Sequence, residues 1–354
     1  MVPPRQPILP RAIRAGDLIA VTAPSSGVPP AMHPRLDLVL EHLRAQGFRV
    51  VEGSCLRAEG ETAKSRSASA PRDDRDAELL RFLEDPEVAA IIPPWGGELA
   101  TELLTRIDFE ELRSQRPKWL LGYSDTSTLL LPLTLITGWA TAHGPNLMDM
   151  VHTQTDALTT GTLGVLGSDF SAPVHQASAP RFQPRWRDFA AMPDAPLDLT
   201  EPVEWKRLDG SNEALTMCGR LIGGCLDTVS LLAGSPYGDV PGFVERAGSN
   251  GVILYLENVD LSPGAMVRTL LSLERHGWLR NLTGLAFGRS ARAPETKPNH
   301  LDYVGALRSV LGDYPFPVLY DVDVGHMPPQ FTLINGAQSE WSFEDGGGTL
   351  VMSS

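Results

Sequence analysis

The sequence predicts an α/β protein, with a mainly parallel sheet in its first 150 residues and a second, β-rich α/β domain after it. Short apolar runs alternate with amphipathic helical segments in the first 150 residues. This order is typical of βαβ units whose helices cover both faces of a sheet. The pattern weakens over residues 151–205, which are rich in Pro, Ala, Ser, Thr and Asp, and it resumes afterwards. We therefore expect an N-terminal domain at 1–150, a crossover at 151–205 and a C-terminal domain at 206–354.

In the first 150 residues, each apolar run is short and ends in polar, Gly or Pro residues, as buried strands do. The strands that we expect lie at residues 16–23, 48–51, 88–92, 118–121 and 138–143. Apolar residues three and four positions apart predict helices at residues 32–46, 73–83, 98–107 and 126–136. The polar segment 54–72 predicts a surface loop.

The second half shows the same two patterns and a different tail. Strands are predicted at residues 251–256, 282–288 and 317–321, and helices at 266–277 and 303–311. A further helix, led by Leu226, Val229 and Leu232, is expected after three glycines, Gly219, Gly223 and Gly224. Residues 330–351 alternate in short runs separated by an Asn-Gly pair and a triple glycine, which indicates antiparallel strands.

Candidate site residues follow the strands of the first half. Ser26, the pair Gly96-Gly97 and Ser124 each come directly after a predicted strand. In parallel sheets, ligands bind at the carboxyl ends of the strands, so we expect these residues to lie together. Two glycines in that place indicate a backbone that approaches another group closely, or else a plain tight turn.

Ser124 has two interpretations. It lies between a strand that stops at Gly122 and a helix that begins at residue 126. A sharp turn there can aim the hydroxyl at a substrate, and the helix N-terminus favours developing negative charge. Alternatively, Ser124 or Asp125 is simply the N-cap of the helix.

Glu257 and His326 also follow apolar strands. Considered alone, each has an ordinary explanation. A glutamate after a strand is usually a solvated turn residue, and a lone histidine in a Gly-His turn usually makes a local hydrogen bond. Together with Ser124 they supply a nucleophile, a base and a carboxylate that orients the base. The order Ser, Glu, His is that of the α/β-hydrolases, but Thr126 stands where those enzymes place a glycine.

The composition excludes several kinds of partner. A formal net charge of −13 argues against a nucleic-acid polymer or an anionic membrane surface. The three cysteines have no CxxC spacing, which predicts a reducing compartment and no zinc site. We also find no stretch long enough for a membrane span and no signal peptide, so we expect a cytoplasmic protein without metal or cofactor.

Seven segments together resemble the LD-carboxypeptidases, serine peptidases of the S66 type that include the microcin C immunity proteins. They occur in the family's order over nearly the whole chain. They are GDLIAVTAPSS (16–26), WGG (95–97), GYSDTS (122–127), HGPN (143–146), GRLIGGCLDTVSLLAGSPY (219–237), ILYLENVD (253–260) and GHMPPQFTLINGA (325–337).

The resemblance implies a catalytic triad of Ser124, His326 and Glu257, with an oxyanion hole formed by the backbone N–H groups of Gly97 and Asp125. It implies a flavodoxin-like N-terminal domain and a smaller β-rich C-terminal domain. The site would lie in the groove between them, in a homodimer.

The substrate that the resemblance implies depends on the branch of the family. Murein-recycling members typically carry Arg-Gly-Gly-Tyr where this chain has Trp95-Gly96-Gly97-Glu98. The immunity branch resembles this stretch more, although it commonly has Tyr-Asn-Ser after the glycines. We therefore expect cleavage of an amide in a peptidyl- or aminoacyl-nucleotide, with Trp95, Trp186 and Trp205 as candidate substrate contacts. The alternative is release of D-Ala from a murein tetrapeptide.

Two other classes of function stay open. A non-catalytic binding protein could use the same groove, and it would not need the serine, histidine and glutamate together. A metal-dependent hydrolase could use His143 or His326 with aspartates, although the sequence contains no HExxH motif or paired His/Asp spacing.

Overall fold

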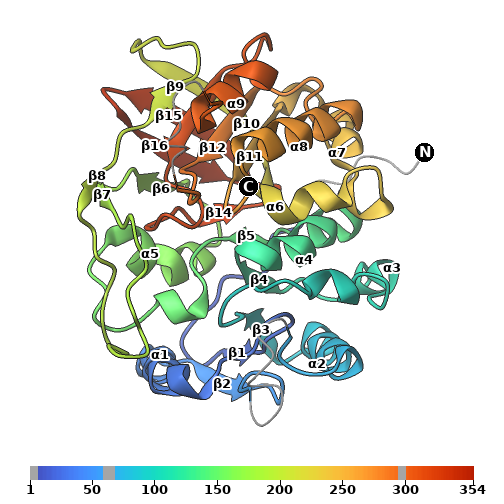
Figure 1. Ribbon diagram of the computed structural model, residues 1–354. Helices are drawn as coiled ribbons and strands as arrows, with labels where there is room; N and C mark the ends of the chain where they lie inside the picture. Colours follow the sequence, from blue (N-terminus) through green and yellow to red (C-terminus); the bar gives the residue numbers. More distant parts are fainter. Residues whose placement is uncertain (1–6, 59–67, 294–299) are drawn as a thin grey trace.

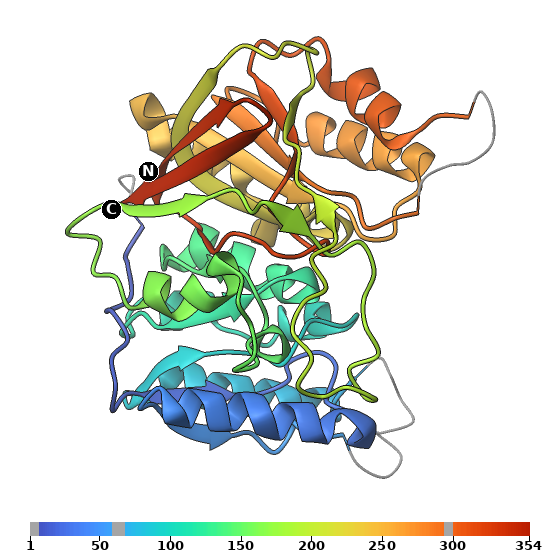
Figure 2. The ribbon, with the colours of Figure 1, turned by 90° about the vertical axis from the view of Figure 1, so that its left-hand side faces the viewer.

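The structure, a computed structural model, describes residues 7–58, 68–293 and 300–354 as two stacked α/β layers (Figures 1 and 2). It confirms the predicted fold class, because one sheet is mainly parallel and the second is β-rich. Part of the predicted loop at 54–72, residues 59–67, lies outside the described residues. None of the described helices is both long enough and apolar enough to span a bilayer.

The first sheet has six strands in the order β14-β5-β4-β3-β1-β2. All neighbours are parallel except β14, which runs antiparallel to β5 and comes from the far end of the chain. The central strands β3 and β4 are buried throughout, as strands covered on both faces should be. The bounds are β1 Leu18–Val21, β2 Arg49–Glu52, β3 Val88–Ile91, β4 Trp119–Gly122, β5 Ala142–His143 and β14 Leu333–Ile334.

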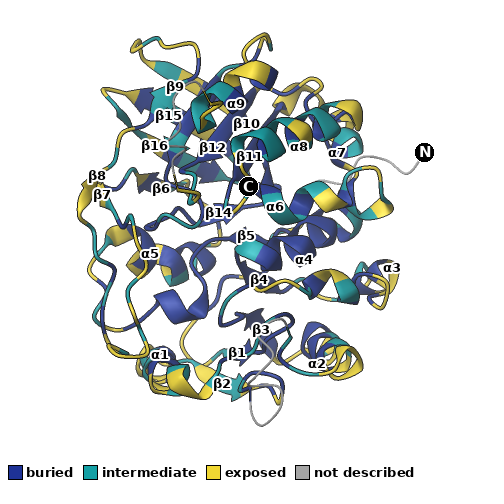
Figure 3. Ribbon diagram, in the orientation of Figure 1, coloured by how far each residue is buried: buried dark blue, intermediate teal, exposed yellow. Residues whose placement is uncertain are grey.

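Helices cover both faces of this sheet (Figure 1). Leu36, Val39, Leu40 and Leu43 of α1 recur at helical spacing and are buried. Every residue of α4 is buried, because this helix lies between the two sheets (Figure 3). The bounds are α1 His33–Ala45, α2 Arg72–Glu84, α3 Phe109–Leu112, α4 Ser127–Pro132, continued by a π-helical turn Leu133–Thr137, and α5 Ala157–Leu166.

The second sheet has eight strands in the order β6-β16-β15-β10-β11-β12-β13-β9. Its centre, β10 to β13, is parallel, and antiparallel strands extend it on both sides. The bounds are β6 Val174–Ala177, β9 Lys206–Arg207, β10 Leu215–Cys225, β11 Val252–Glu257, β12 Gly284–Gly288, β13 Val318–Val322, β15 Gln338–Glu344 and β16 Gly347–Ser353.

The remaining elements are short or cover the second sheet. Helices α6 Leu226–Val229, α7 Val240–Ala247, α8 Pro263–Arg275 and α9 Tyr303–Leu311 pack on it. A separate pair of strands comprises β7 Arg181–Phe182 and β8 Glu201–Pro202. The 3-10 helices are Pro30–Met32, Ala100–Leu103, Ser124–Thr126, Leu147–Asp149, Ser230–Leu232, Pro236–Gly238 and Gly248–Asn250.

Three local predictions differ from the structure. The expected helix 98–107 is only a 3-10 helix over Ala100–Leu103, and the expected strand 138–143 is only Ala142–His143. The glycines expected to precede a helix lie inside β10. Gly223 and Gly224 are needed there, since a Cβ on Gly223 would lie 1.8 Å from the Tyr255 carbonyl oxygen.

The crossover contributes to both layers. Its strand β6 pairs with β16 in the second sheet, and its helix α5 packs with the first. Between β7 and β8 the chain extends from the second layer down to α1 (Figure 2), where Arg35 donates to the Pro193 and Ala195 carbonyls. The exact domain boundaries at residues 150 and 206 stay a prediction.

One apolar cluster runs through both layers. It includes Leu129 and Leu130 of α4, Ile222 of β10, Leu226 of α6 and Leu254 of β11. Burial of such side chains stabilises a fold by roughly 1.5–3 kcal/mol each. The two sheets therefore share a core instead of meeting through solvent.

Replacing Leu254 by Ala should lower the free energy of unfolding by about 2–5 kcal/mol, because the side chain is fully buried in the central strand. Denaturant unfolding followed by circular dichroism would measure this change. The matched control is Leu231→Ala, at a leucine that is 74% exposed, where we expect a change within about 0.5 kcal/mol. Equal effects of the two substitutions would contradict the assigned core.

Candidate active site

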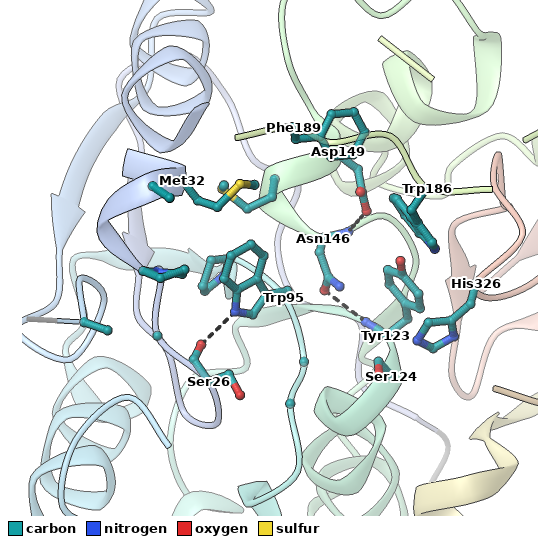
Figure 4. A pocket seen from close by; sticks show the side chains of 18 of the residues that line it. Ser26, Met32, Trp95, Tyr123, Ser124, Asn146, Asp149, Trp186, Phe189 and His326 are labelled. Atoms are coloured by element: carbon teal, nitrogen blue, oxygen red, sulfur yellow. Dashed lines mark hydrogen bonds between the residues drawn. The ribbon is translucent and has the colours of Figure 1, made fainter. Parts of the chain in front are cut away.

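A pocket of about 730 Å³ lies at the carboxyl ends of the strands of the first sheet (Figure 4). Ser26, Gly96, Gly97 and Ser124 line it, and these residues follow β1, β3 and β4 as the sequence predicted. His326, from the turn after β13 in the second sheet, lines the same pocket. The structure thus brings together residues that are as much as 300 positions apart in the sequence.

Ser124 has the backbone of a sharp turn between strand and helix. Tyr123 is extended, with φ −146° and ψ −167°, whereas Ser124 has a φ of 61° and begins a 3-10 helix. A positive φ in a non-glycine residue costs of order 1–3 kcal/mol and is concentrated at functional sites. The Ser124 side chain is partly exposed and faces the pocket. The simple N-cap interpretation is less apt, since no side-chain capping bond occurs at the start of this 3-10 helix or of α4.

The two glycines after β3 allow their loop to pack against this turn. A Cβ on Gly96 would lie 2.8 Å from the Ser124 Cβ and 2.8 Å from the Asp125 backbone nitrogen. Gly97 has a φ of 145°, and a Cβ there would lie 2.3 Å from the Ser26 hydroxyl. The close approach that the sequence suggested therefore exists, and it is to Ser124 and Ser26.

Asp125 fastens the loops around the turn through its side chain. Its buried carboxylate accepts hydrogen bonds from the Ser25 hydroxyl at 2.6 Å and the Ala100 backbone N–H at 2.8 Å. Its backbone N–H belongs to the first turn of the 3-10 helix, where N–H groups have no acceptor within the helix. The side chain thus holds the loops that carry Ser25 and Ala100 against the turn, and the backbone N–H is available for the predicted oxyanion role.

Glu257 and His326 are in direct contact. The His326 Nδ1 is 2.9 Å from Glu257 Oε2 and 3.1 Å from Oε1. Glu257, the last residue of β11, is fully buried. Gly325 makes this contact possible, because a Cβ there would lie 2.5 Å from the carboxylate.

The two charges act on each other's pKa. Burial alone would raise the pKa of Glu257, but the His326 imidazole and its hydrogen bond outweigh burial and lower that pKa below its usual range. Burial alone would lower the pKa of His326, but the Glu257 carboxylate, aided by the charges of Asp227 and Asp149, raises that pKa above its usual value. The arrangement suits an imidazole that accepts a proton and is stabilised as a cation.

Three contacts join the second sheet to the Ser124 turn. The rings of Tyr123 and His326 meet edge to face, with centroids 4.7 Å apart. The Cys225 backbone N–H donates to the Ser127 hydroxyl at 3.2 Å, and the Thr228 hydroxyl lies 3.4 Å from the Ser124 carbonyl oxygen. The position of His326 relative to Ser124 therefore depends on contacts between the layers.

The structure places the three candidate tryptophans differently. Trp95 and Trp186 line the pocket, and the Trp95 indole N–H donates to the Ser26 carbonyl at 2.9 Å (Figure 4). Trp205 is 1% exposed, packs against Phe331 and Trp341, and does not line the pocket. The expectation that Trp205 contacts the substrate is therefore wrong, because this ring is part of the core.

Several pocket residues escaped the sequence reasoning. Apart from Met32, which begins the predicted helix 32–46, they lie in loops and a short 3-10 helix, where no periodicity marks them. They are Met32, Tyr123, Asn146, Met148, Asp149, Arg187 and Phe189. Only the HGPN and GYSD segments could have pointed to Asn146 and Tyr123.

His143, which the metal-dependent alternative would use, is buried behind the pocket. Its Nδ1 lies 3.5 Å from the Ser127 hydroxyl. Burial lowers its pKa to about 4, so this imidazole is neutral at physiological pH. Within the described residues, no three His, Cys, Asp or Glu side chains gather in a way that could hold a metal ion.

Comparison with known proteins agrees with this geometry. The sequence model of the LD-carboxypeptidase N-terminal domain matches residues 19–144, and that of the C-terminal domain matches residues 218–340. A Bacillus subtilis relative, named a probable murein peptide carboxypeptidase, is 27% identical over 93% of this chain and 90% of its own. The microcin C7 self-immunity protein MccF of Escherichia coli is 24% identical over 96% of this chain and 94% of its own.

Among solved structures, MccF in complex with glutamyl sulfamoyl guanosine superposes with a TM-score of 0.80. The match covers 98% of this chain and 99% of that one at 20% identity, so it shows a shared fold. The two family matches together span more than half of the sequence and include the positions of all three candidate triad residues. The chain belongs to the LD-carboxypeptidase family.

Proposed function

We propose that this protein is a serine hydrolase that cleaves an amide bond through an acyl-enzyme. In this proposal Ser124 is the nucleophile, His326 the general base and then acid, and Glu257 the carboxylate that orients His326. One observation carries the proposal: Ser124, in a left-handed turn, shares a pocket with an imidazole whose other nitrogen is 2.9 Å from a buried carboxylate.

The proposed reaction has two halves. The Ser124 Oγ attacks the substrate carbonyl while its proton passes to the Nε2 of His326, and Glu257 stabilises the imidazolium. His326 then gives the proton to the leaving amine as the C–N bond breaks. Water, deprotonated by His326, hydrolyses the ester and restores Ser124.

The backbone N–H groups of Gly97 and Asp125 would stabilise the oxyanion. The packing of Gly96 against Ser124 and the Asp125 nitrogen supports this role, because it brings the loop that carries Gly97 against the Ser124 turn. Loss of one such donor typically costs about 10²–10³-fold in turnover. Neither donor is a side chain, so the position of both N–H groups depends on Gly96, Gly97 and the hydrogen bonds of the Asp125 carboxylate.

For the substrate, we propose an amide in a peptidyl- or aminoacyl-nucleotide. The aromatic rings of Trp95, Trp186 and Phe189 line the pocket and could stack on a base, a contact that contributes about 1–3 kcal/mol. MccF, of the same fold, binds glutamyl sulfamoyl guanosine. The relative named a probable murein peptide carboxypeptidase favours the second candidate, release of D-Ala from a murein tetrapeptide. The family resemblance also leads us to propose a cytoplasmic homodimer.

Replacing Ser124 by Ala should lower kcat by at least about 10³-fold while substrate still binds, because the nucleophile is lost and the pocket stays intact. Steady-state kinetics and equilibrium binding would measure the two effects. Ser309→Ala, at an exposed serine on α9, is the matched control and should keep normal turnover. Near-normal turnover of Ser124→Ala would refute the triad and favour the metal-dependent alternative, whereas no turnover in the unsubstituted protein would favour the non-catalytic one.

The kcat/KM should rise with pH through a pKa above 6.5, because His326 must be neutral to accept the proton and Glu257 raises its pKa. Glu257→Gln removes the charge that raises this pKa, so the acid limb should move to lower pH. Turnover should also fall by about 10²–10⁴-fold. Glu344→Gln, at an exposed glutamate, should leave the profile unchanged. An unmoved acid limb in Glu257→Gln would argue that this carboxylate does not act on the base.

The purified protein should hydrolyse glutamyl sulfamoyl guanosine faster than a murein tetrapeptide. The reason is that the aromatic side chains of the pocket can stack on a nucleobase, which the tetrapeptide lacks. Chromatographic detection of released glutamate and D-Ala, side by side, would measure both rates. The Ser124→Ala protein is the blank for each reaction. Release of D-Ala alone would establish the murein candidate and remove the nucleotide one.

A further inference from the structure

The pocket contains one carboxylate that the proposed reaction does not use. Among the described residues that line the pocket, Asp149 is the only acidic one and Arg187 the only lysine or arginine. Arg187 already forms an ion pair with Asp198, 2.6 Å away. In the view of Figure 4, Asp149 lies between the rings of Phe189 and Trp186. The pocket thus offers a fixed negative charge on one wall.

Asp149 is held rigidly by its own turn. It ends the 3-10 helix Leu147–Asp149, and its Oδ2 accepts a hydrogen bond from the Asn146 backbone N–H at 3.0 Å. The Asn146 side chain in turn accepts from the Asp149 backbone N–H and from the Tyr123 N–H. This capping box connects Asp149 to the residue next to Ser124 and fixes the direction of its carboxylate.

Among the described residues, no lysine or arginine is paired with this carboxylate. Arg35 is the cation that acts most strongly on Asp149, but its Nε donates to the Met148 carbonyl and its Nη1 to the carbonyls of Pro193 and Ala195. Within the described part of the chain, Asp149 forms no ion pair with any lysine or arginine. Asp149 is 8% exposed, and burial raises its pKa to about 6 although Arg35 opposes the rise. A buried carboxylate without a paired cation attracts a cationic ligand.

We propose that Asp149 is a specificity-determining residue that binds a protonated amino group of the substrate while the scissile carbonyl lies at Ser124. The ring of Trp186 would add a cation–π attraction, whereas the Phe189 ring already stacks with the Arg35 guanidinium. This inference rests on the proposed function and narrows its substrate class. The substrate is an aminoacyl or peptidyl amide with a free amino group, and an N-acylated substrate is disfavoured.

The test combines one substitution in the protein with one change in the ligand. Glutamyl sulfamoyl guanosine and its N-acetyl derivative are titrated by calorimetry into protein that carries Ser124→Ala, which prevents turnover. Asp149→Asn keeps an oxygen for the Asn146 N–H and removes the charge. N-acetylation and Asp149→Asn should each weaken binding roughly 10- to 100-fold, and together no more than either alone, because both remove the same contact.

The matched control is Asp198→Asn, which removes a negative charge near the pocket from a side chain that does not line it. In this control N-acetylation should still weaken binding by the full amount. Equal affinity of Asp149-containing protein for the two ligands, or additive effects of the two changes, would overturn the inference.

Failure of the inference is distinguishable from failure of the proposed function. A serine-directed phosphonate, applied to protein with Ser124 intact, labels this residue if it is the activated nucleophile, and mass spectrometry locates the adduct. Labelled Ser124 with no binding of either ligand would overturn the amine site and leave the serine hydrolase in place. Absence of labelling would refute the hydrolase itself.

Discussion

The contacts between the two sheets determine whether this molecule has an active site. Ser124 belongs to a turn of the first sheet, while Glu257 and His326 belong to the second. The Tyr123 ring against His326, together with the hydrogen bonds that Cys225 and Thr228 make to the Ser124 turn, sets the second sheet on the first. The buried helix α4 and the shared apolar core hold that arrangement. In the proposed mechanism, docking of the two sheets is therefore a requirement for catalysis.

Buried charge in the site is balanced in two different ways. Glu257 is fully buried beside an imidazole that can take a positive charge, so the pair compensates internally. Asp149 is nearly as buried, but Arg35 forms no ion pair with it and donates from Nε and Nη1 to backbone carbonyls. One carboxylate is thus paired within the protein, and the other has no paired lysine or arginine among the described residues. In our proposals, the first tunes the base and the second selects the substrate.

The sequence predicted the elements whose burial pattern is periodic, such as α1 and α9. It also predicted that Ser26, Gly96-Gly97 and Ser124 would lie together, because parallel strands end at one edge of a sheet. It did not predict β10, whose glycines resemble a turn but are required by the close carbonyl of Tyr255. Trp205 was misjudged because an aromatic residue in an irregular segment can pin the core or face a ligand, and only packing decides. Asp149 could not be found, since it lies in a short 3-10 helix without periodicity and the pocket that it lines includes residues over 100 positions away, such as Ser26.

The central claim is that the Ser124 hydroxyl is activated by His326 beside the N–H groups of Gly97 and Asp125. A crystal structure of the protein after reaction with a serine-directed phosphonate tests it most directly. We expect a covalent bond from the Ser124 Oγ to phosphorus, one phosphoryl oxygen accepting hydrogen bonds from both N–H groups, and the His326 Nε2 within about 3 Å of the adduct. An adduct on another residue, or one on Ser124 with His326 turned away and the oxygen in solvent, would contradict this account.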